Sequence, residues 1–208
     1  MRTWPTGTAK ENLSASALAS DTGTWQLHTG AGCQLVIGRF PPFAYNASKG
    51  GGQVVQGPTD GQGLVSLQVP CAGLTIPPLD GRTARLFGLP LPAGISVQIT
   101  PDLLEGCLNP STGELELTFR SRFRFTVGPA KAPLYQASDL VVETALTSGN
   151  VQGQRHRGRG QALNGQGRGR LVGVATIAPC KDGWLNAFLG LPDEALAVMD
   201  VQLIGPWS

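Results

Sequence analysis

Histidine is scarce in this sequence, and the side-chain patterns that usually signal enzyme chemistry are missing. The two histidines are His28, next to an apparent strand, and His156, which stands among arginines whose positive charge disfavours a metal cation. There is no Gly-x-Ser-x-Gly elbow, Walker loop, dinucleotide fingerprint or metalloprotease motif. Glu114 and Glu116 form a carboxylate pair, but on the wet face of an expected strand, which favours solvated surface over a glycosidase pair. We therefore predict no catalytic residue, no metal and no cofactor, and lean against an enzyme.

Long apolar runs are also missing, so the sequence predicts no transmembrane helix. The first 20 residues contain no continuous apolar stretch of the kind found in secretory signals. The four cysteines, Cys33, Cys71, Cys107 and Cys180, include no close pair. This spacing fits neither a zinc module nor a compact disulfide scaffold, and it predicts buried, reduced thiols in a cytoplasmic protein.

Turn-forming residues, in contrast, are abundant. The chain contains 29 glycines and 16 prolines in 208 residues, both of which interrupt helices and furnish turns. This composition favours many short strands joined by turns. We expect a loosely ordered tail over residues 1–22 and one soluble antiparallel β domain over residues 23–208.

Several segments have the periodicity of strands. Residues 25–28 and 33–37 are expected to pair as a hairpin around residues 29–32. The following segment, 38–53, contains paired prolines and three successive glycines, so we expect an extended or looped crossing rather than a central strand. Its aromatic residues Phe40, Phe43 and Tyr45 are predicted to close a barrel end or cover a core.

The clearest strand covers residues 114–127. Its inward row contains Phe119, Phe123 and Phe125, whereas Arg120, Arg122 and Arg124 alternate with them on a wet face. A turn at residues 109–113 joins it to the preceding strand. Further strands are expected at 64–69, 95–99, 140–146, 171–177 and 201–204, and helices at 184–188 and 192–199. The fold class is therefore all-β with a short C-terminal helix, an antiparallel meander that is barrel-like or a two-layer sandwich.

Positive charge is concentrated in one third of the chain. Residues 120–170 carry a net charge of +7, whereas the remainder carries −5. The segment 153–170, GQRHRGRGQALNGQGRGR, contributes five arginines, and no acidic residue occurs between 144 and 181 to neutralise them. We expect a mobile hairpin loop here that extends the charged strand face. The predicted anionic-partner surface comprises Arg120, Arg122, Arg124, Arg155, Arg157, Arg159, Arg168 and Arg170.

This charge predicts a non-enzymatic module that docks on an acidic protein surface or on anionic lipid head groups. RNA binding through the Arg-Gly loop is one alternative. The other alternative is a lipocalin-like barrel that binds or converts an apolar small molecule against Phe119, Phe123 and Phe125. A continuous internal cavity lined by these rings would favour the apolar ligand, whereas a filled interior would favour docking. The sequence does not determine the oligomeric state.

Three phrases, GRFPPFAYNASKGGG, LPLPAGISVQITPDLLEGCLNPSTGELELTFRSRFRF and FLGLPDEALAVMDVQL, resemble conserved proteins of cyanobacteria and plastids that have no assigned activity. The resemblance covers much of the chain and contains no catalytic motif. It implies an origin rather than a mechanism, and adds a peripheral position on a photosynthetic membrane to the expected cytoplasmic location.

Overall fold

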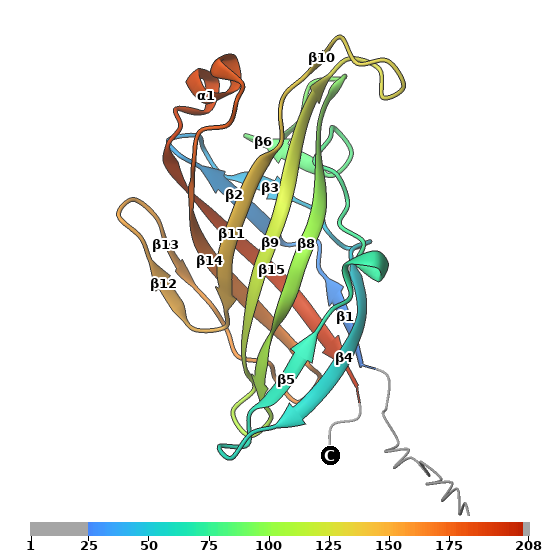
Figure 1. Ribbon diagram of the computed structural model, residues 1–208, viewed down its shortest axis with the longest axis vertical. Helices are drawn as coiled ribbons and strands as arrows, with labels where there is room; N and C mark the ends of the chain where they lie inside the picture. Colours follow the sequence, from blue (N-terminus) through green and yellow to red (C-terminus); the bar gives the residue numbers. More distant parts are fainter. Residues whose placement is uncertain (1–24, 206–208) are drawn as a thin grey trace, which may run out of the picture.

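Eight antiparallel strands close into a barrel in the computed structural model, which describes residues 25–205 (Figure 1). Around the ring the strands are β1 (Trp25–Thr29), β4 (Gly51–Thr59), β5 (Val65–Gln68), β8 (Ile95–Asn109), β9 (Glu114–Val127), β11 (Leu140–Thr147), β14 (Arg168–Ile177) and β15 (Asp193–Ile204). The ring closes where β1 pairs with the end of β15, from Gln26 opposite Ile204 to Thr29 opposite Val201. The predicted all-β antiparallel class is confirmed, and the closed ring decides for a barrel over a sandwich.

Shorter elements complete one end of the barrel, at the top of Figure 1. Strand β15 continues past β1 to pair with β2, and the sheet extends from there through three further strands. These elements are β2 (Cys33–Ile37), β3 (Phe43–Tyr45), β6 (Ala84–Leu86), β7 (Leu89–Pro90), β10 (Tyr135–Gln136) and the helix α1 (Gly183–Leu189), whereas the 3-10 turn η1 (Cys71–Gly73) lies at mid-height beside the barrel. A separate two-stranded sheet of β12 (Asn150–Gln152) and β13 (Arg157–Arg159) lies outside the barrel.

The hairpin of β8 and β9 runs the full height of the barrel. Its register extends from Ile95 opposite Val127 to Asn109 opposite Glu114, and Gly113 closes the turn in the left-handed conformation that glycine favours. Along β9 the odd-numbered residues face the interior and the arginines face solvent. The predicted alternation and the predicted turn are both confirmed.

The expected hairpin between residues 25–28 and 33–37 is wrong. Both β1 and β2 pair antiparallel with the same strand, β15, so the chain keeps its direction across residues 30–32. The Gly30 N–H donates to the Asp200 carbonyl, and a Cβ at Gly32 would lie 2.3 Å from a carboxylate oxygen of Asp200. Glycine is therefore used here for close approach to β15 rather than for a reversal of the chain.

A helix predicted at residues 192–199 is also wrong, because Asp193–Ile204 forms the single long strand β15. It pairs with β14 from Asp193 to Gln202 and with β2 on the other side from Ala195 to Val198. Two flanking strands satisfy its backbone along this stretch, which outweighs the helical preference of Ala, Leu and Met. The predicted strand at 201–204 is the end of β15, and the predicted helix at 184–188 is confirmed as α1.

The segment 38–53 is more regular than expected. Phe43–Tyr45 forms β3 with a strand on each side, β2 and β6, and Gly51 already begins β4. Between these strands the chain crosses to the β1 side, where the Thr29 N–H donates to the Gly50 carbonyl. A short central strand was overlooked because the neighbouring prolines and glycines dominate the local pattern.

No helix within residues 25–205 is long and apolar enough to span a bilayer. The tail predicted over residues 1–22 lies outside the described residues.

Candidate apolar ligand site

The upper half of the barrel encloses a cavity of about 410 Å³. Three hydrophobic clusters surround it. The first fills the lower half of the barrel with residues such as Leu108, Leu115 and Leu203, the second centres on Tyr45 and Leu79, and the third lies beneath α1 around Leu185. The lower cluster therefore forms the floor of the cavity, and the other two form part of its wall and roof.

The inward row of β9 supplies one wall. Phe119, Phe123 and Phe125 all line the cavity, together with Leu117 below them. Because side chains of a strand alternate between its two faces, the arginines between these rings are directed away from the cavity. The three phenylalanines predicted for an apolar ligand are thus brought together at one cavity.

The aromatic residues of the 38–53 segment supply the opposite wall. Phe40, Phe43 and Tyr45 line the cavity, whereas the sequence favoured a plug at a barrel end or a core cover for these rings. The Tyr45 hydroxyl donates to the Pro77 carbonyl, and burial raises the pKa of Tyr45. This hydroxyl is therefore neutral and already satisfied by the backbone.

Residues 74–83 close the gap between β8 and the β3–β6 strands, although no strand pattern is present in this segment of the sequence. Leu79 exchanges backbone hydrogen bonds with Val97, and Leu74, Ile76 and Leu79 line the cavity. The only readable sign was the Asp-Gly turn pair after Leu79.

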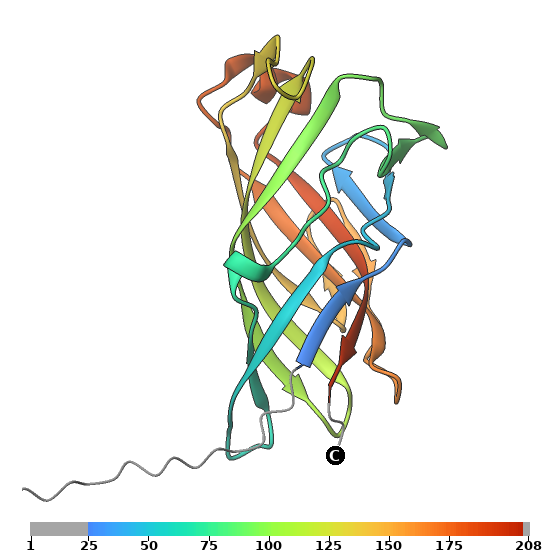
Figure 2. The same ribbon diagram turned by 90° about the vertical axis from the view of Figure 1, so that its right-hand side faces the viewer.

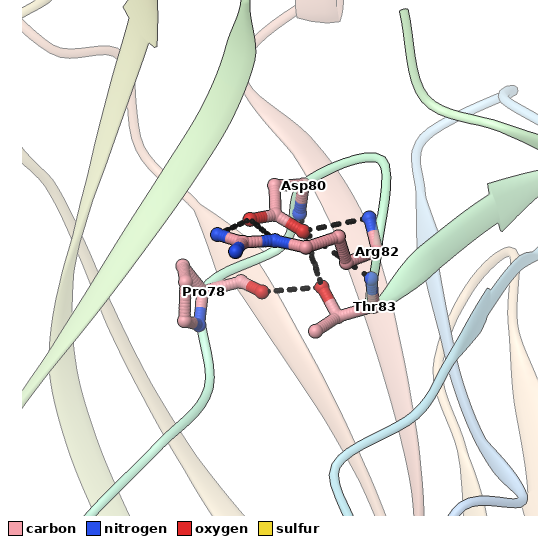
Figure 3. Close-up of polar contacts among 4 residues, drawn as sticks. All are labelled: Pro78, Asp80, Arg82 and Thr83. Carbon is pink, nitrogen blue, oxygen red and sulfur yellow. Dashed lines mark hydrogen bonds and ion pairs between the residues drawn. The ribbon is translucent and has the colours of Figure 1, made fainter. Parts of the chain in front are cut away.

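A polar turn around Asp80 fixes this wall segment (Figure 3). The Asp80 carboxylate accepts from the Arg82 backbone N–H at 2.8 Å and pairs with the Arg82 guanidinium at 3.0 Å, while the Thr83 hydroxyl donates to the Pro78 carbonyl. Partial burial alone would raise the pKa of Asp80, but the hydrogen bonds from Arg82 and Thr83 outweigh it and lower the pKa. The ionised carboxylate therefore holds the turn that directs Leu79 inward.

Helix α1 covers the upper end of the cavity. Its N-cap Asp182 accepts from the Leu185 N–H at 2.9 Å and from the Tyr135 hydroxyl at 2.6 Å, and Gly190 ends it in the left-handed conformation. The hydrogen bonds from Tyr135 and Leu185 lower the pKa of Asp182, while desolvation and Asp182 raise the pKa of Tyr135 to about 12. Leu185, Phe188 and Leu189 line the cavity from above.

No charged side chain is among the described residues that line the cavity. Its side-chain hydroxyl groups belong to Thr29, Tyr45, Thr75 and Thr144. Those of Thr29, Tyr45 and Thr144 donate to backbone carbonyls. The site offers a large apolar surface and almost no free hydrogen-bonding capacity.

The predicted arginine surface has a different character. On the outer face of the sheet Arg120 pairs with Glu143 at 2.7 Å, Arg122 with Asp102 at 2.8 Å, and Arg124 with Asp139 at 2.7 Å. These hydrogen bonds lower the pKa values of Glu143 and Asp139. The strand face is therefore a ladder of exposed ion pairs and not an unneutralised patch.

Acidic residues of β15 reach the arginine-rich segment. Arg155 pairs with Asp193 at 3.0 Å and Arg170 with Asp200 at 2.8 Å, so the expectation that no acid neutralises this segment is wrong for both. Asp193 and Asp200 are distant from these arginines in the sequence. They become neighbours only because β15 pairs with β14 in the sheet. Arg157, Arg159 and Arg168 are exposed and form no ion pair within residues 25–205.

The same segment is shaped by one carboxylate. Glu194 accepts from three consecutive backbone N–H groups, those of Gln154, Arg155 and His156, at 2.7 to 3.2 Å. This contact fastens the turn between β12 and β13 to the barrel wall. The expected mobile hairpin loop thus contains a short β-hairpin whose turn is held against β15.

The four cysteines are free thiols, of which only Cys33 is fully buried, and burial raises its pKa. No group of three or more His, Cys, Asp or Glu side chains in the described part of the chain is arranged to hold a metal ion. Comparisons with protein-family models, with curated proteins and with solved structures found no match to this chain.

Proposed function

We propose that this protein binds an apolar small molecule inside the upper half of its barrel. The observation that carries the proposal is the cavity of about 410 Å³ behind Phe119, Phe123 and Phe125. Small-molecule sites typically measure about 300–1,000 Å³ and are lined mainly by hydrophobic and aromatic side chains. A filled interior would have favoured docking through the arginine-rich face. Because the interior contains a cavity, we prefer binding of an apolar ligand.

The lining also narrows the class of ligand. A charged group would lose its hydration without gaining a partner, because no charged residue lines the cavity. Each square ångström of apolar surface that a ligand buries contributes about 25 cal/mol. The proposed ligand is accordingly a neutral hydrocarbon-like molecule, or one whose polar end stays outside. Without an acid, base or nucleophile at the cavity, binding is preferred over conversion.

Adjacent valines on β11 provide the test. Val142 lines the cavity, whereas Val141 is exposed on the outer face. Val142→Phe should fill part of the cavity and weaken binding of a neutral apolar fluorescent probe such as N-phenyl-1-naphthylamine by about tenfold or more. Binding is measured by fluorescence titration and by calorimetry.

Val141→Phe is the matched control, since it adds the same ring to the same strand on the opposite face. It should leave probe affinity unchanged. Equal affinities for both variants and the wild type, with both variants folded by circular dichroism, would show that the cavity is not the binding site.

Docking of the arginine-rich face on an anionic partner is a second candidate. It is supported by Arg157, Arg159 and Arg168, which are exposed and have no ionic partner among the described residues. An acidic protein surface suits these three arginines better than RNA, because no aromatic side chain stands between them to stack on bases. A cytoplasmic location, peripheral to a photosynthetic membrane, is part of the same proposal.

A further inference from the structure

Large apolar side chains are exposed at the upper end of the barrel, on the elements that surround the cavity. Trp184 and Phe188 of α1 are 54% and 48% exposed, and Leu134, just before β10, is 87% exposed. On the β6–β7 hairpin Phe87 and Leu89 are 80% and 69% exposed. Together these five residues are called the apolar rim. Exposed aromatic residues grouped in this way mark interaction sites.

Helix α1 and β10 both lie at the top of Figures 1 and 2, and ring contacts join them. The rings of Trp184 and Phe188 are stacked 5.2 Å apart, and the Tyr135 ring stands edge-on to Trp184 at 5.1 Å. Phe188 also contacts Phe40 and Phe125, whose side chains line the cavity. The β6–β7 hairpin projects sideways from the same half of the molecule (Figure 2). The rim and the cavity wall therefore share the side chain of Phe188.

Positive charge surrounds the rim. The rim segments 38–42, 84–91, 128–135 and 179–191 contain four basic residues, Arg39, Arg85, Lys131 and Lys181, and one acidic residue, Asp182. All four basic residues are exposed, and none forms an ion pair with a described residue. The carboxylate of Asp182 is occupied by Tyr135 and the Leu185 N–H, and nearby Asp193 is paired with Arg155.

We infer that the apolar rim docks on a lipid bilayer that contains anionic head groups, and that the cavity exchanges its ligand with that bilayer. Tryptophan, phenylalanine and leucine beside lysine and arginine suit the boundary between acyl chains and phosphates. The inference deepens the proposed function, because a neutral apolar ligand is concentrated in bilayers and the rim residue Phe188 lines the cavity. An acidic protein would satisfy the charge but would leave the projecting Phe87 and Leu134 side chains without an apolar environment.

Vesicle flotation tests the inference without any added ligand. The full-length protein should float with vesicles of phosphatidylcholine and phosphatidylglycerol, and less with phosphatidylcholine alone. The double variant Phe87→Ser, Leu134→Ser should lower the partition coefficient by about tenfold or more, since two large apolar side chains no longer enter the interface. The matched control is Val55→Ser, Ile204→Ser, which removes two exposed apolar side chains on β4 and β15, away from the rim, and should float like the wild type.

Two further measurements separate the explanations. The variant in which Arg157, Arg159 and Arg168 are all changed to Gln should float like the wild type. If this variant no longer floats while the rim variant still does, the arginine-rich face and not the rim binds the membrane. In vesicle-free buffer the rim variant should bind the apolar probe with wild-type affinity. Loss of membrane docking and loss of cavity binding can therefore be told apart. Wild-type protein that does not float with anionic vesicles, or a rim variant that floats as well as the wild type, overturns the inference.

Discussion

Two buried serines differ in whether their hydroxyl groups find a partner. Ser121, on the inward row of β9 between Phe119 and Phe123, is 0% exposed, and its Oγ forms no hydrogen bond with any described residue. Ser148 is 7% exposed, and its Oγ accepts from the Leu115 N–H at 2.9 Å. A buried polar group without a partner costs free energy, whereas removal of a partner leaves the other group unsatisfied.

We expect opposite effects from the same substitution at these two positions. Ser121→Ala should leave the free energy of unfolding unchanged or raise it by up to about 1 kcal/mol, because an unpaired hydroxyl is removed. Ser148→Ala should lower it by about 1–3 kcal/mol, because the Leu115 N–H loses its side-chain acceptor. Denaturant unfolding of both variants gives the comparison. A larger loss for Ser121→Ala than for Ser148→Ala would mean that the Ser121 hydroxyl has a partner of its own.

At the scale of elements, the β12–β13 hairpin depends on one carboxylate of β15. Glu194 holds three backbone N–H groups of the turn, and the hydrogen bonds from Arg155, the largest contribution, and from Gln154 lower its pKa below the ordinary 4.5. A carboxyl with a lowered pKa contributes its stabilisation at pH values above the ordinary pKa. This contribution is lost as the pH falls through the lowered value.

The attachment of the hairpin should therefore be sensitive to acid. Below pH 4.5 the amide resonances of Gln154, Arg155 and His156 should shift as Glu194 is protonated, while the rest of the barrel stays folded. Glu194→Gln should show weakened amide protection at these three residues already at neutral pH. Glu114→Gln, an exposed carboxylate on β9, serves as the control. Protection that is the same in Glu194→Gln and the wild type would show that the hairpin is held by Arg155–Asp193 and its packing alone.

At the scale of the whole molecule, the barrel is divided into a packed end and a hollow end. The lower half contains a dense cluster of buried leucines and valines and is closed by the β1–β15 pairing. The upper half surrounds the cavity and is completed by short strands, the 74–83 segment and α1. Local stability follows apolar contact density, so the two ends should open with different free energies.

Hydrogen exchange should reveal this division along the single strand β9. Amides of residues 114–119 should exchange more slowly than those of residues 122–127, although both parts are paired on two sides over most of their length. Saturation with an apolar ligand should slow exchange at residues 117–125, where Leu117, Phe119, Phe123 and Phe125 border the cavity, more than at residues 114–116. Uniform protection along β9, with no ligand effect, would contradict both the division and the cavity as the site.

The sequence by itself determined the strands whose two faces have different environments. The alternation of residues 114–127 was readable because one face meets apolar side chains and the other meets water, and this placed Phe119, Phe123 and Phe125 correctly. Turn chemistry likewise located the β8–β9 reversal at Asn109–Gly113. These features depend on neighbours within a few residues.

Only the tertiary structure decided which segments meet. Strand β15 contains residues that favour a helix, and it became extended because β14 on one side and β1 and β2 on the other satisfy its backbone. The same strand carries Asp193, Glu194 and Asp200 to the arginine-rich segment, which changes an apparent basic patch into a set of ion pairs and a docked hairpin. The cavity is also a tertiary property. It exists because three separate clusters pack around a shared space, and no local pattern records the space that side chains leave unfilled.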